Sequence, residues 1–186
     1  MELERRITVI RQLEIELLVA AIDISKRDRG LAAQVLDTSF ATIDVYSRLD
    51  PVRASKRMEE LMLFNRKSIF TISKSFAKPN RNIPLKTPPL SEAAIRIKSL
   101  VRKISVSIRD IACSVNEGAD AIMVLFGLTE EQSVIIRNSS VDELEEWVYQ
   151  NPCVLDLKFK KPDELLKLVN IKLTREAGMY LDKLAS

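Results

Sequence analysis

A proline-rich stretch at residues 73–90, SKSFAKPNRNIPLKTPPL, interrupts the regular patterns on both sides of it. The stretch holds four of the seven prolines in the chain. Because proline fixes φ and removes a backbone donor, this composition favours an extended linker over a helix or a central strand. The sequence therefore predicts an N-terminal module at residues 1–72, a Pro/Lys-rich linker at 73–90 and a C-terminal module at 91–186.

The rest of the sequence has a composition typical of helical proteins. Of the 186 residues 46% are apolar, 30% are charged and only 5% are aromatic, and there are 4 glycines. This balance is rich in helix formers and poor in turn and strand residues, so it predicts a mostly α-helical fold. Periodicity and capping residues predict helices over residues 4–26, 30–37, 40–48, 51–64, 91–115, 120–126, 130–137, 141–150, 162–169 and 175–184. Ser68–Ile72 and Cys153–Phe159 are predicted as short β runs, the second because its apolar residues alternate.

The order of these elements repeats in the two halves. Each half has a long amphipathic helix, a short apolar helix, a turn, two further helices and a β run. LAAQVLDTS at 31–39 aligns with AIMVLFGLT at 121–129, at an offset of 90 residues. Two such copies would pack about a pseudo-two-fold axis, as a homodimer does, and their β runs would pair. Two unrelated helical halves are the alternative. Since Asp37 stands where the second copy has Gly127, we expect the turn to differ between the copies.

Several classes of active site are missing from this sequence. Histidine is absent, so there is no histidine general base, no histidine-dependent triad and no Cys/His zinc site. Cys113 and Cys153 are 40 residues apart and are expected to be buried, reduced thiols of a cytoplasmic protein. We therefore expect neither an enzyme nor a bound metal or cofactor. No apolar run reaches 18 residues, so no transmembrane helix is expected.

The net charge of +3 is unevenly distributed along the chain. Residues 53–110 carry 14 basic and 4 acidic side chains, whereas residues 1–52 and 111–186 are mildly acidic. A positive block of this kind is a candidate surface for nucleic-acid phosphates. A solvated linker with basic flanks is the alternative interpretation.

Two groups of basic residues are the candidate nucleic-acid-binding sites. Lys158, Lys160 and Lys161 lie between a predicted strand and the start of a helix, where a phosphate can bind, and Arg175 begins the last helix. Arg96 and Lys103 lie on the long basic helix of the second half, together with Lys98 and Arg102. The alternatives are a basic strand edge that deters aggregation and a solvated helix face.

The segment DAIMVLFGLTEEQSVIIRNSSVDELEEWVYQNPCVLDLKFKKPDELL, at 120–166, resembles FlhD, a subunit of the bacterial flagellar master transcriptional activator. The resemblance rests on the turn Phe126-Gly127-Leu128, the helix start at Thr129, the boundary at Asn151 and the alternating run LDLKF at 155–159. Residues 17–39 are similar more weakly. Together the two matches cover roughly 110 residues, and neither includes a catalytic motif.

This resemblance implies a mostly helical protein that acts with an FlhC-like partner to activate promoters, with promoter DNA contacted through the complex. It implies a cytoplasmic protein without a membrane partner, and further oligomerisation stays open. Members of the family are one module long and often have a cysteine in the strand, where this chain has Leu155; an intersubunit disulfide is therefore not expected. The alternative function is a protein–protein adaptor or antagonist on the same scaffold that does not bind DNA.

Overall fold

The computed structural model describes residues 2–64, 68–72, 91–114, 118–150, 155–157 and 161–184. The linker at 73–90, Cys153, Lys158 and Lys160 lie outside the described residues. The elements up to the linker are α1 (Glu2–Arg27), α2 (Arg29–Leu36), α3 (Phe40–Arg48), α4 (Pro51–Phe64) and β1 (Phe70–Ile72). Those after it are α5 (Glu92–Ser114), α6 (Gly118–Phe126), α7 (Glu130–Asn138), α8 (Val141–Gln150), β2 (Leu155–Leu157), α9 (Asp163–Asn170) and α10 (Thr174–Leu184). The predicted mostly helical fold is confirmed.

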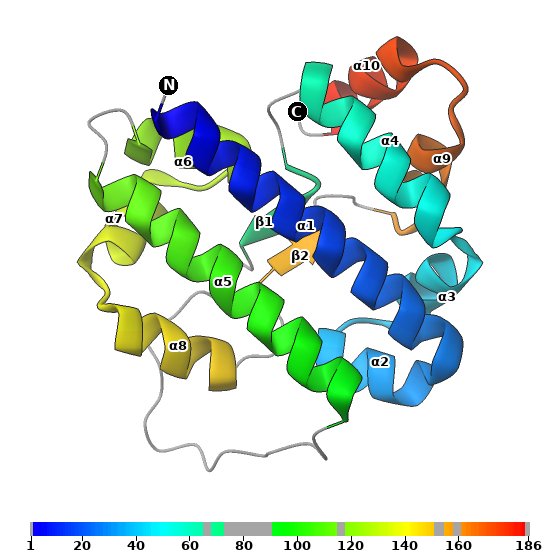
Figure 1. Cartoon of the computed structure of the whole chain (residues 1–186), viewed down its shortest axis with the longest axis horizontal. Helices are drawn as coiled ribbons and strands as arrows, with labels where there is room; N and C mark the ends of the chain where they lie inside the picture. Colours follow the sequence, from blue (N-terminus) through cyan, green and yellow to red (C-terminus); the bar gives the residue numbers. More distant parts are fainter. Residues whose placement is uncertain are drawn as a thin grey trace.

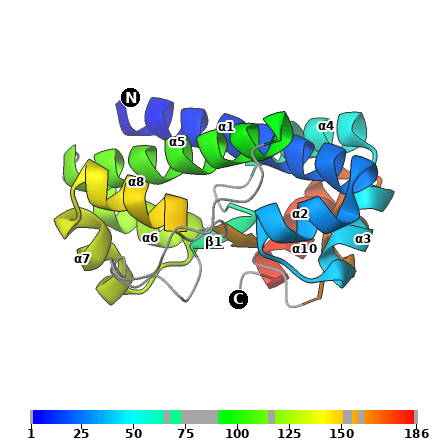
Figure 2. The same cartoon turned by 90° about the horizontal axis from the view of Figure 1, so that it is seen from below.

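Helices α1 and α5 lie side by side and form one face of the molecule (Figures 1 and 2). They run in opposite directions, as the colours in Figure 1 show. The inner side of α1 contacts α2, α3 and α4, and the inner side of α5 contacts α6, α7 and α8. Their apolar stripes meet in one continuous core that includes Leu18, Ile22, Ile104 and Ile108.

The two short strands join the halves of the chain below this helical layer (Figure 2). β1 and β2 pair antiparallel, with Phe70 opposite Leu157, Thr71 opposite Asp156 and Ile72 opposite Leu155. Each strand lies within a segment that the sequence predicts as a β run, although it has only three residues. Each strand thus supplies backbone hydrogen-bond partners to the other.

The helix ends repeat at an interval of 90 residues. Ser39 caps α3 by accepting from the Thr42 backbone N–H, and Thr129 caps α7 by accepting from that of Gln132. The helix before each cap ends in the same kind of turn. In the first turn Thr38 N donates to Ala33 O, and in the second Leu128 N donates to Met123 O. The next helix follows the same pattern, since Asp50 accepts from Arg53 N and Ser140 accepts from Glu143 N.

The expected difference between the turns at Asp37 and Gly127 was wrong. Both residues take the left-handed conformation, with φ of 44° at Asp37 and 66° at Gly127. Aspartate is among the few side chains that tolerate this region, because its short polar group bonds locally. The turn therefore has the same geometry in both halves although its residue differs.

Asp37→Gly is expected to stabilise the chain by about 0.5–1 kcal/mol, because glycine removes the steric cost of the left-handed conformation. Gly127→Ala is expected to destabilise it by about 1 kcal/mol for the reverse reason. Urea unfolding measures both changes. Equal effects of the same sign would contradict a shared left-handed turn.

Other side chains depart from their expected burial. The long helices were predicted to be amphipathic, yet Ile95 of α5 is 51% exposed, and Leu13 and Ile15 of α1 are only partly buried. Cys113 is a free cysteine, as expected, but it is exposed rather than buried. It lies near the end of α5 beside α7, where its thiol donates to the Arg137 carbonyl at 3.5 Å.

Helices α9 and α10 pack on the N-terminal half of the chain. α9 packs against α3 and α4, and α10 packs against α4 (Figure 1). Leu165, Leu168, Ala177 and Leu181 are fully buried side chains of this layer. The C-terminal helices therefore stabilise the N-terminal half of the chain.

Candidate functional site

At the predicted phosphate-binding position before α9, a carboxylate of the chain itself accepts a backbone hydrogen bond. Lys161 is exposed, but its backbone N–H donates to Glu164 Oε2 at 3.1 Å. Asp163 adds a second acid in the same first turn. Burial, followed by the negative charge of Glu164, raises the pKa of Tyr180 in α10. Two acidic side chains thus lie at the start of α9, and one of them accepts from the Lys161 backbone N–H. Their negative charge weakens the attraction of this helix start for a phosphate.

Lys161 and Arg175 lie at opposite ends of α9. Arg175 is exposed in the first turn of α10, after the C-terminal end of α9. Because α9 has eight residues, its two ends are roughly 12 Å apart. The whole of α9 thus lies between Lys161 and Arg175 along the chain. Lys158 and Lys160, the other members of this predicted group, lie outside the described residues.

Arg96 and Lys103 occupy a different part of the molecule. Both are exposed on α5, about two helical turns apart, and α5 lies away from α9 and α10 in both views (Figures 1 and 2). Their neighbour Arg102 forms an ion pair with Glu145 of α8. Among the described residues, Arg96 and Lys103 thus lie on a different part of the molecule from Lys161 and Arg175.

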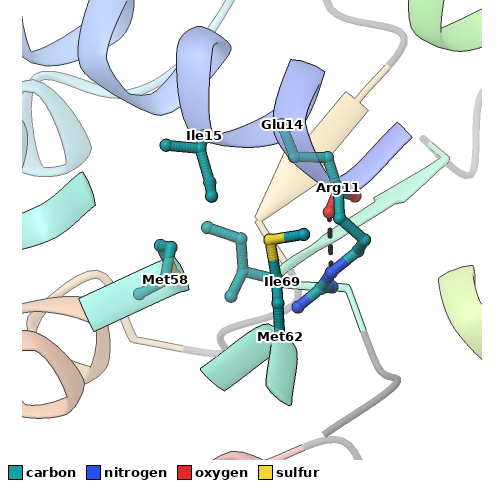
Figure 3. A pocket seen from close by; sticks show the side chains of 6 residues that line it. All are labelled: Arg11, Glu14, Ile15, Met58, Met62 and Ile69. Atoms are coloured by element: carbon teal, nitrogen blue, oxygen red, sulfur yellow. Dashed lines mark ion pairs between the residues drawn. The ribbon is translucent and has the colours of Figure 1, made fainter. Parts of the chain in front are cut away.

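A buried polar cluster that the sequence reasoning missed lies between α1, α4 and the approach to β1 (Figure 3). Arg11 and Glu14 form an ion pair at 3.3 Å, with side chains 6% and 3% exposed. The Ser68 hydroxyl donates to Glu14 Oε1 and accepts from the Phe70 backbone N–H at 2.8 Å. The Ser68 backbone N–H donates to the Leu125 carbonyl at 2.9 Å. This cluster connects α1, the start of β1 and α6.

The cavity beside this cluster is too small for an organic ligand. It measures about 10 Å³, which is close to the space that one water occupies, and its other walls are Ile15, Met58, Met62 and Ile69. Figure 3 shows the apolar side chains facing Arg11 and Glu14. The arrangement therefore serves packing and strand positioning better than binding.

A second polar cluster fastens α4 to the start of α10. Arg57 Nη1 donates to Glu60 Oε2 at 2.8 Å and to Thr174 Oγ1 at 3.1 Å, and Nη2 donates to the Ile171 carbonyl. Thr174 Oγ1 donates to Glu60 Oε2 at 3.0 Å. The last helix was predicted to begin at residue 175; it begins at Thr174, whose side chain joins that helix to α4. Glu60 and Thr174 are 114 residues apart, so no local pattern in the sequence pointed to this contact.

Within the described ranges, no group of three or more cysteine and acidic side chains could hold a metal ion. No helix among these residues is both long and apolar enough to span a membrane.

Searches of protein-family models, of curated proteins and of solved structures found no significant match to this chain.

Proposed function

We propose that this chain is a non-catalytic subunit of a bacterial transcriptional activator complex. In this proposal two FlhD-like modules in tandem form a pseudo-dimer, which acts in the cytoplasm with an FlhC-like partner at promoter DNA. The family part of the proposal depends on the resemblance at 120–166. The observation that carries the proposal is the repetition of helix packing and capping bonds at an offset of 90 residues.

The packing contacts support the tandem arrangement. The contacts of α1 with α2, α3 and α4 match those of α5 with α6, α7 and α8, and the contact of α2 with α3 matches that of α6 with α7. The contacts of α1 with α5 and of β1 with β2 join the two sets. An axis between α1 and α5 would relate the modules, as a two-fold axis relates the subunits of a homodimer.

The polar clusters support a structural role over catalysis. Arg11 and Ser68 both contact the buried Glu14, beside a cavity with room for about one water. Arg57, Glu60 and Thr174 hydrogen-bond to one another, and Arg57 also donates to the Ile171 carbonyl between α9 and α10. Both arrangements fix elements in place, so the proposed function is association with other macromolecules.

An adaptor that does not bind DNA is the second candidate function. Two observations favour it: Arg96 and Lys103 are remote from Lys161, and Glu164 satisfies the Lys161 backbone N–H. Both observations leave a smaller phosphate-binding surface than a single cluster of these basic side chains would offer. DNA binding by the purified chain and by its complex separates the two functions.

The combined change of Lys158, Lys160 and Lys161 to Ala tests the DNA-binding role. If these lysines neutralise phosphates in the complex, removing each such charge should lower the slope of log affinity against log salt by roughly 0.9. Affinity should fall about equally for promoter and unrelated DNA, because phosphate contacts carry no sequence information. Fluorescence anisotropy at several salt concentrations measures both quantities.

A variant with Arg96 and Lys103 changed to Ala, compared in the same assay, tests the α5 group separately. Lys26→Ala, at an exposed position in the last turn of α1, is a matched control for loss of a surface charge. An unchanged salt slope in both test variants, together with loss of partner binding, would favour the adaptor function over the DNA-binding one.

A further inference from the structure

The two halves differ in what covers their third and fourth helices. In the N-terminal half, α9 packs on α3 and α4, and α10 packs on α4. In the C-terminal half the corresponding helices are α7 and α8, which pack against α5 and, for α7, also α6. In the part of the chain that the structure describes, no second helical pair corresponds to α9 and α10. Among the described residues, α9 and α10 therefore cover one of two corresponding faces, and no helical pair covers the other.

The uncovered face is far more acidic than its covered counterpart. Residues 40–60 have four acidic and four basic side chains, whereas residues 130–150 have six acidic and one basic. At an offset of 90 residues, Arg53 is replaced by Glu143 and Lys56 by Glu146. The net charge of −5 over 130–150 marks this face as complementary to a positive surface.

Apolar side chains accompany these acids. Val134 of α7 is 47% exposed and lies near these acids in the sequence. Ile135 is partly exposed, whereas its counterpart Val45 is buried in the half that α9 covers. Exposed aliphatic groups among acids are the chemistry that an amphipathic basic helix fits.

We propose that the α7–α8 face, residues 130–150, binds a basic amphipathic helix of a partner protein. This proposal rests on the proposed function, because it assigns a surface to the partner. Some of these acids already interact within the chain: Glu143 accepts from Ser140 N, and Glu145 forms an ion pair with Arg102. Glu130, Glu131 and Asp142 remain exposed to solvent.

A second copy of this chain is a poorer occupant of the same face. A symmetric dimer through α7 and α8 would place the same surface on both sides of the interface, so the acids of one copy would oppose those of the other. Like charges across an interface oppose association strongly. The occupant must therefore bring positive charge that this face does not itself contain.

Site-specific photocrosslinking of the full chain in its native cells tests the proposal. Benzoylphenylalanine is placed at Val134, and at Val9 of α1 as a matched control, because both side chains are 47% exposed. The Val134 variant is expected to crosslink to one partner through a peptide with net positive charge and helical apolar periodicity. The Val9 variant is expected to give at least about tenfold less of this product.

Charge reversal tests the stated chemistry. Adding Glu131→Lys and Asp142→Lys to the Val134 crosslinking variant is expected to lower the product at least about tenfold, because like charges then oppose the partner. Adding Glu2→Lys and Glu16→Lys on α1 is the control and should leave the product unchanged. Glu131→Gln with Asp142→Asn gives an intermediate loss, and circular dichroism checks that each variant folds.

Failure of this proposal is distinguishable from failure of the proposed function. A partner that co-purifies but crosslinks equally from Val9, or not at all from Val134, overturns the surface and leaves the function standing. Crosslinking of Val134 to this same chain, or to an acidic peptide, overturns the stated occupant. If no partner co-purifies with the unmodified chain, the surface and the proposed function fail together.

Discussion

Glu14→Ala is expected to destabilise the chain by about 3–5 kcal/mol, the usual cost of removing one partner from a buried ion pair. The loss is large because Arg11 and the Ser68 hydroxyl both contact this carboxylate in the interior. The buried Arg11 charge would lose its acidic neighbour, and the segment before β1 would lose an anchor. Urea unfolding monitored by circular dichroism measures the change in free energy.

The double change of Arg11→Met with Glu14→Leu is the decisive control. Replacing a buried ion pair by apolar side chains of similar volume is often neutral or stabilising. The double variant is therefore expected to recover most of the stability that Glu14→Ala loses. If the double variant is as unstable as the single one, the loss comes from packing around Met58 and Met62 and not from an unpaired charge. Glu2→Ala, which removes an exposed ion pair with Arg6, should change stability little.

Arg57→Leu is expected to cost about 3 kcal/mol and to release α9 and α10 from α4. Glu60, Thr174 and the Ile171 carbonyl would each lose a hydrogen bond from the buried guanidinium. Polar groups left unsatisfied in a buried interface cost about 1–3 kcal/mol each, and part of this returns as water enters. Amide hydrogen exchange should therefore accelerate in α9 and α10 well before it accelerates in α1 and α5.

Arg53→Leu is the matched control for this change, because Arg53 lies on the same helix but is exposed. It should leave hydrogen exchange in α9 and α10 unchanged. Thr174→Val should produce a smaller loss of about 1 kcal/mol, since it removes only the hydroxyl of the cluster. Exchange that accelerates uniformly over the whole chain in Arg57→Leu would show that Arg57 does not act specifically on the C-terminal helices.

The sequence predicted those elements whose signals are local. Helix α3 was predicted from Phe40 to Arg48 and α4 from Pro51 to Phe64, as the structure has them, because Ser39 and Asp50 are caps that act within one turn. The helix start at Thr129 was predicted for the same reason, and the structure has a capping box there with Gln132. The left-handed turn at Asp37 was missed because glycine was taken as its only signal.

Long-range polar contacts were not predictable in the same way. Arg57 and Thr174 are more than 100 residues apart, and no pattern within either helix identifies the partner. Arg11 and Glu14 did offer a signal, since they fall on the same side of α1 as Ile10 and Leu18, where charged side chains must be paired. Of the candidate DNA-binding residues, Lys158 and Lys160 lie outside the described residues, and the DNA-binding role stays a prediction.

The docking of α9 and α10 on α4 has a consequence for synthesis on the ribosome. Roughly 100 residues separate the end of α4 from the start of α9, and translation at about 5–20 residues per second needs about 5–20 s to produce them. During this interval the nascent N-terminal half has an incomplete core, with the Arg57 side chain and its apolar neighbours open to solvent or to a chaperone. The N-terminal half is thus synthesised first, but its packing is completed late. A truncated chain that is released before α9 and α10 are made is therefore especially prone to aggregation.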